Sequence, residues 1–244
     1  MNTPSIGTWL SLPNESIAEI FSNAGYEWVV IDLEHSSINI SQAESLIRTI
    51  DLAGSRPFIR LSGHDPSQIK RVLDAGAKGI LAPMIENAEQ IQTVIDACHY
   101  PPIGNRGMGL ARAQGYGAQD QKNYYIKNGC SEIEIFAQIE SVEAVKNVTS
   151  IFSKAIDGYF IGPYDLSASI GSPGDFGTED FKNAENTILK AAQDANIKAG
   201  FHLVEPNASE INTLSAFGYN MIAYSVDIRM LDHLAREPFD QSDD

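Results

Sequence analysis

Short apolar segments alternate with amphipathic segments along almost the whole chain. A strand that is apolar on both faces is typical of a parallel sheet covered on both sides. The apolar segments that predict strands are Ile6–Leu10, Trp28–Asp32, Pro57–Arg60, Gly79–Ala82, Ile133–Gln138, Gly158–Ile161, Lys198–Phe201 and Met221–Tyr224.

The intervening segments repeat apolar residues at helical spacing. They predict helices over 15–24, 41–53, 66–75, 87–98, 141–153, 181–196 and 207–217, with a last helix after Asp227. Asp65 before Pro66 is a helix-start signal, and Gly25 and Gly76 stand where helices end before strands. Eight strand–helix units favour an α/β fold of the (β/α)8 type, a TIM barrel. A doubly wound open sheet is the alternative.

The segment from Tyr100 to Gly129 interrupts this rhythm and is rich in glycine and proline. A long loop in a compact domain is usually functional or part of an interface. Nothing else in the chain resembles a linker, so we expect a single barrel domain over residues 1–244.

Composition narrows the class of protein. The 244 residues carry a formal net charge of −15, which disfavours nucleic acid as a partner. No apolar run is long enough to predict a membrane span, and residues 1–8 lack the features of a signal peptide. Cys98 and Cys130 have no metal-binding or redox spacing, which favours reduced thiols in a cytoplasmic protein.

Polar residues gather where the predicted strands end, which is where barrels of this kind hold their active sites. These residues are Asp32, Glu34, His35, Arg60, Gln138, Glu140, Gly162, Pro163, Tyr164, Asp165, His202, Ser225 and Asp227. Charges at the mouth of an apolar barrel are costly unless they pair with each other or with a ligand.

Glu140 and Asp165 follow adjacent predicted strands and form the sharpest pair. Two carboxylates without a nearby cysteine suit a hard divalent ion such as Mg²⁺ or Mn²⁺, and they leave coordination positions open for substrate. The alternative interpretation is that each carboxylate caps the helix that follows it, at Ser141 and at Leu166.

Arg60 ends an apolar strand, so its guanidinium is expected in the barrel mouth. There it either grips a carboxylate or enolate oxygen of a ligand or forms a salt bridge to a neighbouring acid. His35 is a candidate general base tuned by Asp32, although a histidine after a strand is more often structural. The same structural alternative applies to His64 and His202, and the sequence gives less reason to assign either of them a catalytic role.

The nine lysines argue against one mechanism. None of them ends a predicted strand, and Lys78 and Lys198 precede strands instead. Schiff-base aldolases need a buried lysine at this end of the barrel. Carbanion chemistry here would therefore need a metal ion as the electron sink.

Several segments, in their order and spacing, resemble the class II pyruvate aldolases of the HpcH/HpaI family over nearly the whole chain. The matching segments are Trp28–His35, Pro57–Arg60, Asp65–Gly76, Tyr100–Gly107, Gln138–Glu140 and Asp157–Ser169. The resemblance implies a phosphoenolpyruvate/pyruvate-binding type of TIM barrel. It also implies reversible aldol cleavage of a 4-hydroxy-2-oxo acid, or 2-keto-3-deoxy acid, to pyruvate and an aldehyde.

The resemblance also implies roles for individual residues. Glu140 and Asp165 would bind a divalent metal ion (Mg²⁺, Mn²⁺ or Co²⁺) that carries the pyruvate enolate. The catalytic group would be His35 with Asp32, together with Arg60 on the keto oxygen and Asp74 from a neighbouring subunit. Substrate would contact Arg60, Gln138, Gly162, Pro163 and Tyr164. The family is typically a hexamer with the last helix exchanged, which would bring Arg106 and Arg112 to a shared site.

The sequence departs from the family pattern at Tyr164, where a small residue is usual, and in the segment 36–40. These two departures leave the identity of the aldehyde undetermined. Three rival functions also stay open. One is decarboxylation of oxaloacetate, or a related pyruvate-enolate lyase reaction, at the same site. The second is a non-catalytic binding barrel. The third, a phosphate-binding isomerase, is disfavoured because no glycine-rich phosphate loop follows the last two strands.

Overall fold

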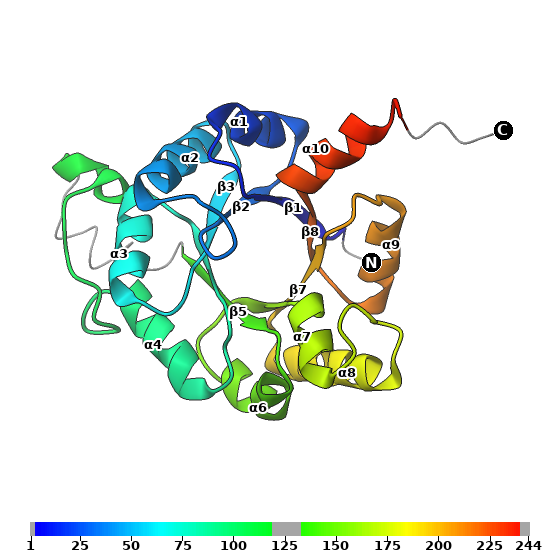
Figure 1. The fold of residues 1–244 in the computed structure, drawn as a ribbon. Coiled ribbons are helices and arrows are strands. Elements are labelled where there is room, and N and C mark those ends of the chain that lie inside the picture. Colours follow the sequence, from blue (N-terminus) through cyan, green and yellow to red (C-terminus); the bar gives the residue numbers. More distant parts are fainter. Residues whose placement is uncertain (1–2, 119–132, 240–244) are drawn as a thin grey trace.

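Eight parallel strands close into a barrel in chain order within the described residues, which are 3–118 and 133–239 of this computed structural model (Figure 1). The strands are β1 (Ser5–Leu10), β2 (Trp28–Asp32), β3 (Arg56–Arg60), β4 (Gly79–Ala82), β5 (Glu134–Ile139), β6 (Gly158–Ile161), β7 (Lys198–Leu203) and β8 (Met221–Val226). Because β1 pairs with β8, the sheet has no free edge. The barrel prediction is confirmed and the open-sheet alternative is wrong.

Helices surround the barrel and return the chain to the start of each next strand (Figure 1). They are α1 (Glu15–Ala24), α2 (Ile40–Leu52), α3 (Pro66–Ala75), α4 (Ala88–Cys98), α6 (Val142–Phe152), α7 (Pro163–Ile170), α8 (Glu179–Ala195), α9 (Ser209–Phe217) and α10 (Asp227–Arg236). No helix among the described residues is long and apolar enough to cross a membrane.

The apolar spacing did not predict α7, and a helix at Leu166 entered only through the capping alternative for Asp165. It is short and begins with Gly162-Pro163, a pair that also favours a turn. Part of the long segment after Tyr100 forms a 3₁₀ helix, η1 (Arg112–Gly117), and residues 119–132 of that segment lie outside the described residues.

The residues that predicted the start and the end of α3 occupy those positions in the structure. The Asp65 side chain accepts a hydrogen bond from the Ser67 backbone N–H, and Pro66 occupies the first turn of α3. Gly76 ends this helix with φ at 108°, a left-handed conformation that glycine adopts without steric cost.

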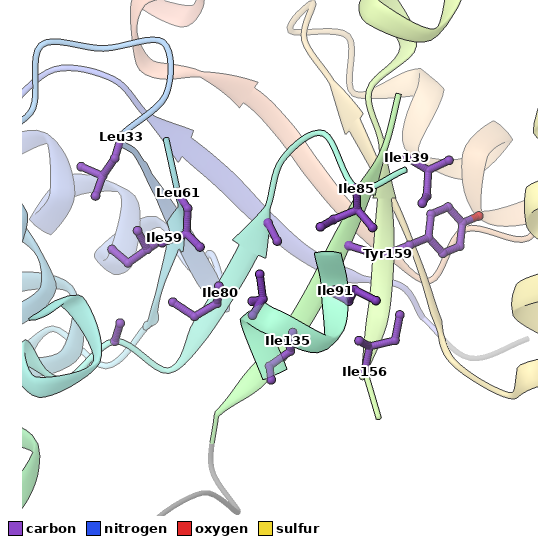
Figure 2. Packing of buried hydrophobic residues seen from close by; sticks show 14 of the residues in the cluster. Leu33, Ile59, Leu61, Ile80, Ile85, Ile91, Ile135, Ile139, Ile156 and Tyr159 are labelled. Carbon is purple, nitrogen blue, oxygen red and sulfur yellow. The ribbon is translucent and has the colours of Figure 1, made fainter. Parts of the chain in front are cut away.

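Two apolar layers hold the fold together. The larger lies between the outer strand faces and the helices and includes Ile59, Ile80, Ile91 and Ile135 (Figure 2). The smaller fills the barrel interior and is mostly aromatic, with Trp28, Phe58, Phe136 and Phe160 among its members. The barrel is therefore a packed core and not a pore.

Small residues make room for these interior rings. A Cβ on Gly7 would lie 2.1 Å from the Trp28 ring, and one on Gly79 would lie 2.4 Å from the Phe58 ring. A side chain at either position would collide with a buried ring on the neighbouring strand.

Strand geometry then decides which polar groups reach the mouth. Side chains alternate between the two faces of a strand, so the residue two positions after an inward aromatic also points inward. Trp28 is inward, as is Val30, and Asp32 follows them at the end of β2. On β5, the inward Phe136 is followed by Gln138 and then by Glu140 just beyond the strand.

Candidate active site

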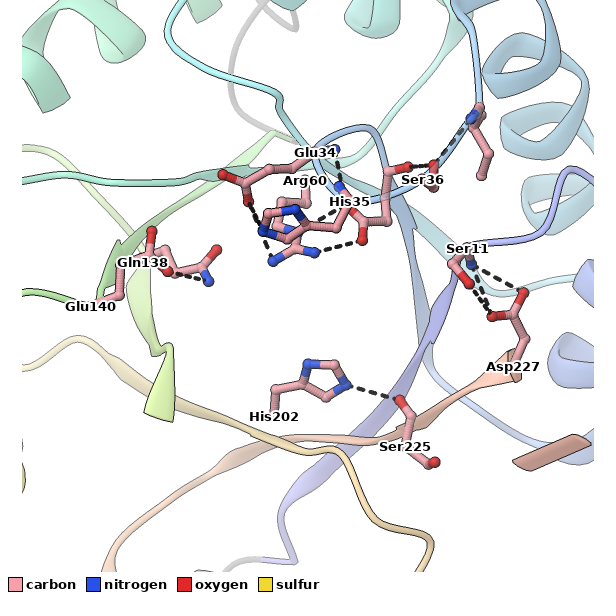
Figure 3. A network of polar contacts seen from close by, with 12 residues as sticks. Ser11, Glu34, His35, Ser36, Arg60, Gln138, Glu140, His202, Ser225 and Asp227 are labelled. Atoms are coloured by element: carbon pink, nitrogen blue, oxygen red, sulfur yellow. Dashed lines mark hydrogen bonds and ion pairs between the residues drawn. The ribbon is translucent and has the colours of Figure 1, made fainter. Parts of the chain in front are cut away.

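A cavity of about 240 Å³ opens at the carboxyl ends of the strands. Its lining includes Trp9, His35, Arg60, Gln138, Phe160, Gly162, Pro163, Tyr164, Asp165 and His202. The structure thus brings most of the predicted site residues to one place. Asp32 and Glu140 join them through hydrogen bonds to Arg60 and Gln138 (Figure 3).

The Arg60 guanidinium is clamped by carboxylates of β2 and its following turn. Its Nε donates to Asp32 Oδ1 at 2.9 Å and its Nη2 donates to Asp32 Oδ2 at 2.5 Å. Nη1 lies 3.3 Å from Glu34 Oε2. Burial opposes ionisation of Asp32, but Arg60 outweighs it and holds the pKa of Asp32 below its usual value. The salt-bridge interpretation of Arg60 therefore holds, and the clamp aims the guanidinium at the cavity that it lines.

Glu140 is an almost fully buried carboxyl, with 4% of its surface exposed. Its Oε1 accepts a hydrogen bond from the Met84 backbone N–H at 2.5 Å, and its Oε2 accepts one from Gln138 Nε2 at 2.7 Å. Met84 adopts φ of 51°, a left-handed conformation that is rare outside glycine. Burial raises the pKa of Glu140 to about 7, and the charges of Glu34 and Asp165 add to the effect.

Gly162 allows this carboxyl to approach the backbone of the next strand. A Cβ at position 162 would lie 2.6 Å from Glu140 Oε2 and 2.9 Å from Glu140 Cβ. Gly162 therefore has a steric role that the sequence did not predict: a side chain at this position would collide with the Glu140 carboxylate.

Asp165 stands in the first turn of α7, exposed at the edge of the cavity. The helix-capping alternative is wrong for both carboxylates. Ser141 caps α6 through its side chain, and Gly162 occupies the cap position of α7. Neither Glu140 nor Asp165 therefore occupies a helix-cap position, although Asp165 is an acidic residue in the first turn of α7.

The donor set suits a hard divalent cation. Glu140 and Asp165 offer carboxylate oxygens, and Gln138 Oε1 is buried without a hydrogen-bond partner among the described residues. Within residues 3–118 and 133–239, no group of three or more His, Cys, Asp or Glu is placed to hold a metal. Two protein carboxylates would thus leave the remaining positions to water and substrate, as expected for Mg²⁺ or Mn²⁺.

His35 and Tyr164 lie at the rim of the cavity. His35 is exposed, and its Nε2 lies 3.9 Å from Glu34 Oε2. Tyr164 is 49% exposed, and its ring packs edge-on against Phe176, with 5.2 Å between ring centroids. Tyr164 is also one of the residues that line the cavity.

Asp74 is not brought to this mouth. It lies near the end of α3, where the chain approaches the start of β4 at the opposite end of the barrel. Arg106 Nη2 donates to its Oδ1 at 2.6 Å, and Gln114 Nε2 donates to the same oxygen at 3.1 Å. A second surface hollow lies beside it and is lined by Arg112, among others. Within one chain, Asp74 cannot act on the cavity.

Sequence reasoning missed Trp9 as a residue of the mouth, whereas Glu34 and His202 were expected at strand ends. Strand geometry directs Trp9 and His202 inward, because each lies two residues beyond an inward glycine, Gly7 and Gly200. Asp227, by contrast, has a structural role. It accepts hydrogen bonds from the Ser11 and Leu12 backbone N–H groups and so ties β1 to β8.

The chain is thus a closed parallel (β/α)8 barrel whose mouth holds a clamped arginine and two carboxylates. A family model described as HpcH/HpaI aldolase/citrate lyase matches residues 5–233. The chain belongs to this family.

Known proteins resemble the chain over most of its length. The 2-keto-3-deoxy-L-rhamnonate aldolase of Klebsiella pneumoniae subsp. pneumoniae is 39% identical over 225 residues, which span 91% of this chain and 82% of that protein. The solved structure of an HpcH/HpaI aldolase/citrate lyase family protein from Burkholderia cenocepacia J2315 superposes with a TM-score of 0.90 and 30% identity, covering 97% of this chain and 93% of that one. An HpcH/HpaI aldolase from Desulfitobacterium hafniense DCB-2 gives a TM-score of 0.90 and 27% identity, covering 97% and 92%.

Replacing Gly162 by alanine tests the steric argument. The new methyl group would displace the Glu140 carboxylate, so we expect Mn²⁺ affinity to fall at least roughly tenfold and stability to fall by about 1–3 kcal/mol. Calorimetric titration with Mn²⁺ and urea unfolding would measure the two effects. Gly63→Ala is the matched control, because nothing lies within 4 Å of its Cβ position and its φ is ordinary. Unchanged Mn²⁺ affinity in Gly162→Ala would refute the argument.

The raised pKa of Glu140 predicts a pH dependence of stability in the metal-free protein. The folded-state pKa of about 7 lies above the usual value of 4.5, so the contribution of the protonated carboxyl is complete below pH 4.5 and is lost as pH rises through 7. Across that window the wild type should lose up to about 3 kcal/mol relative to Glu140→Gln, at 1.36 kcal/mol per pKa unit. Urea unfolding in EDTA at several pH values would measure the difference. Parallel curves for the two proteins would contradict the prediction.

Proposed function

We propose that this lyase cleaves a 4-hydroxy-2-oxo acid of the 2-keto-3-deoxy sugar acid type to pyruvate and an aldehyde, with the help of a divalent metal ion. The observation that carries the proposal is the buried Glu140 carboxylate beside Gln138, at the mouth that Asp165 and Arg60 also line. The name of the Klebsiella relative supports the substrate class.

Glu140 and Asp165 would hold the ion, and the orphaned Gln138 Oε1 would accept a hydrogen bond from a water bound to it. A bound divalent ion would polarise the keto group of the substrate and serve as the electron sink. Mg²⁺, Mn²⁺ and Co²⁺ all accept such oxygen ligands.

Arg60 would donate to the keto oxygen and stabilise the negative charge that develops there as the enolate forms. Asp32 and Glu34 act through Arg60, because they hold the guanidinium in one orientation. Gly162, Pro163 and Tyr164 would contact the substrate from the β6 side of the cavity.

His35 is the proposed acid/base group at the rim. It would take the proton of the C4 hydroxyl, after which the C3–C4 bond breaks to give the aldehyde and the pyruvate enolate. Protonation at C3 then yields pyruvate. His35 is exposed and lines the cavity, which supports its contact with an aldehyde that would enter from solvent.

Proton exchange at the pyruvate methyl group tests the proposal directly. In D2O the wild type should exchange this group only when Mg²⁺ or Mn²⁺ is present, and EDTA should stop the exchange, as followed by NMR. Glu140→Gln and Asp165→Asn should each lose at least roughly 100-fold, since even outer-shell changes cost 10- to 100-fold at metal sites. Glu179→Gln, an exposed acid at the start of α8, is the control.

Two outcomes would count against this function. Exchange that persists in EDTA or in either carboxylate variant would remove the metal assignment. Turnover of oxaloacetate exceeding that of every hydroxy-oxo acid would instead favour the decarboxylase alternative at the same site.

We also propose that the enzyme is a homo-oligomer, specifically a hexamer, in the cytoplasm, and that Asp74 serves the active site of a neighbouring subunit. Helix α10 projects from the barrel in Figure 1 and exposes Ile228, Leu231 and Leu234 along its length. Near Asp74, Leu110 and Tyr116 are also exposed. Exposed apolar surface of this kind supports contact with another subunit.

Breaking the α10 contact tests both parts of that proposal. Wild-type protein should sediment as six subunits, and Leu231→Asp should sediment as smaller species because it places a charge in an apolar contact. Its methyl-exchange activity should fall at the same time, since a separated subunit lacks the partner's aspartate. Ile20→Asp, on the exposed face of α1, should leave both properties unchanged. A monomeric wild type with full activity would overturn the assembly proposal.

A further inference from the structure

His64 lies at the mouth end of the barrel, and the proposed reaction leaves it without a role. It follows β3 in the turn that leads to α3, and it is half-buried. It is not among the described residues that line the cavity. Its Nε2 lies 2.6 Å from the backbone carbonyl oxygen of Pro83, the residue after β4. A carbonyl oxygen only accepts hydrogen bonds, so Nε2 carries a proton and donates it to this contact.

The peptide bond that His64 contacts also reaches the buried carboxylate of the mouth. The carbonyl oxygen of the Pro83–Met84 peptide accepts from His64, and the N–H of the same peptide donates to Glu140 Oε1 at 2.5 Å. One planar peptide unit therefore joins the imidazole to the carboxylate. A donor on the carbonyl oxygen also polarises the amide, which strengthens the hydrogen bond that its N–H gives.

The orientation of this peptide is strained at Met84. The φ of Met84 is 51°, a left-handed value that is rare for a residue with a side chain. Met84 is 48% exposed, so the packing of its own side chain does not impose this conformation. The residues on either side have little freedom, because the ring of Pro83 restricts its own φ and Ile85 is fully buried in the larger apolar layer (Figure 2).

Turning the peptide over would relieve this strain. Rotation of the Pro83–Met84 peptide about its Cα–Cα axis would carry φ of Met84 from the left-handed region to the extended region. The same rotation would direct the carbonyl oxygen towards Glu140 and the N–H away from it. Two contacts oppose the rotation: the His64 imidazole on the oxygen and the Glu140 carboxylate on the nitrogen. Strained backbone that its surroundings hold in place is typical of functional sites.

We propose that His64 is a positioning residue for the metal site: it holds the Pro83–Met84 peptide with its N–H on Glu140 and so fixes this carboxylate for a divalent ion. The inference rests on the proposed function, in which Glu140 binds the ion. Groups that orient a metal ligand contribute to affinity without touching metal or substrate, and their loss typically costs roughly 10- to 100-fold.

The first test is the Mn²⁺ affinity of the wild type and of His64→Phe, measured by calorimetric titration. Phenylalanine keeps a flat ring but removes the donor, so we expect affinity to fall roughly tenfold. His64→Gln offers an N–H at similar reach and should restore most of the affinity. His99→Phe is the matched control and should bind Mn²⁺ as the wild type does, because His99 is also half-buried and its Nδ1 lies 2.7 Å from a backbone carbonyl oxygen, that of Ile95.

The Met84 amide provides a readout that a general loss of stability would not produce. A short hydrogen bond to a carboxylate moves an amide proton resonance downfield, since such charge-assisted bonds are strong. In metal-free protein, the Met84 amide proton should therefore lie downfield in the wild type and move upfield in His64→Phe. It should return towards its wild-type position in His64→Gln and stay in place in His99→Phe.

Replacing Met84 by glycine tests the role of the strain. Glycine adopts the left-handed conformation without steric cost, so in Met84→Gly the peptide gains nothing by turning over. Loss of the His64 donor should then lower Mn²⁺ affinity less than it does in the wild-type background. Such a non-additive result reports coupling between the two positions.

Three outcomes would overturn the inference. Wild-type Mn²⁺ affinity together with an unmoved Met84 amide resonance in His64→Phe would overturn it alone. Additive effects of His64→Phe and Met84→Gly would also overturn it alone, because the histidine would then act independently of the peptide orientation. Absence of Mn²⁺ binding to the wild type would overturn it together with the proposed function.

Discussion

The alternation of side chains along the barrel strands is the constraint on which the mouth depends. Strands β2, β3 and β5 each place an aromatic residue inward, and the residue two or four positions later then also points inward, at the top of the barrel. Trp28 leads to Asp32 through Val30, Phe58 leads to Arg60, and Phe136 leads to Gln138. A slip of one residue in any strand would turn its polar end outward and expose the interior rings. The same strand register is therefore required both to pack the core and to direct the polar side chains into the mouth.

Charge pairing determines how the polar side chains of the mouth are arranged. Arg60 is tied to Asp32 and Glu34 on one side of the mouth, which satisfies a buried cation and its partners together. On the β5 side, Glu140 receives two hydrogen bonds and forms no ion pair among the described residues. Burial raises its pKa to about 7, although the charge of Arg60 opposes that rise. The charge of Arg60 is compensated by its carboxylate partners, whereas the Glu140 carboxyl has no ion-pair partner among the described residues. A divalent cation is the ligand that such an imbalance favours.

The walls of the cavity are shaped by different means. Gly162 gives space, because its missing side chain lets the Glu140 carboxylate lie against the backbone. Tyr164 lines the cavity, and its ring is held by Phe176. His202 stacks on Trp9, and its Nε2 lies 3.0 Å from the Ser225 carbonyl oxygen, next to an irregularity in the pairing of β8 with β1.

The sequence by itself determined the number and order of the strands, the helices that begin with Asp65-Pro66 or end with glycine, and the polar residues that cluster at strand ends. These properties are local: they depend on apolar periodicity and on backbone preferences within a few residues. Only the tertiary structure decided that the sheet closes and that Arg60 pairs with Asp32. It also decided that neither Glu140 nor Asp165 caps a helix and that Asp74 lies at the other end of the barrel. The irregularity in β8 beside His202 belongs to the same group. Each of these features depends on which strands are neighbours and on their exact register, and no short stretch of sequence contains that information.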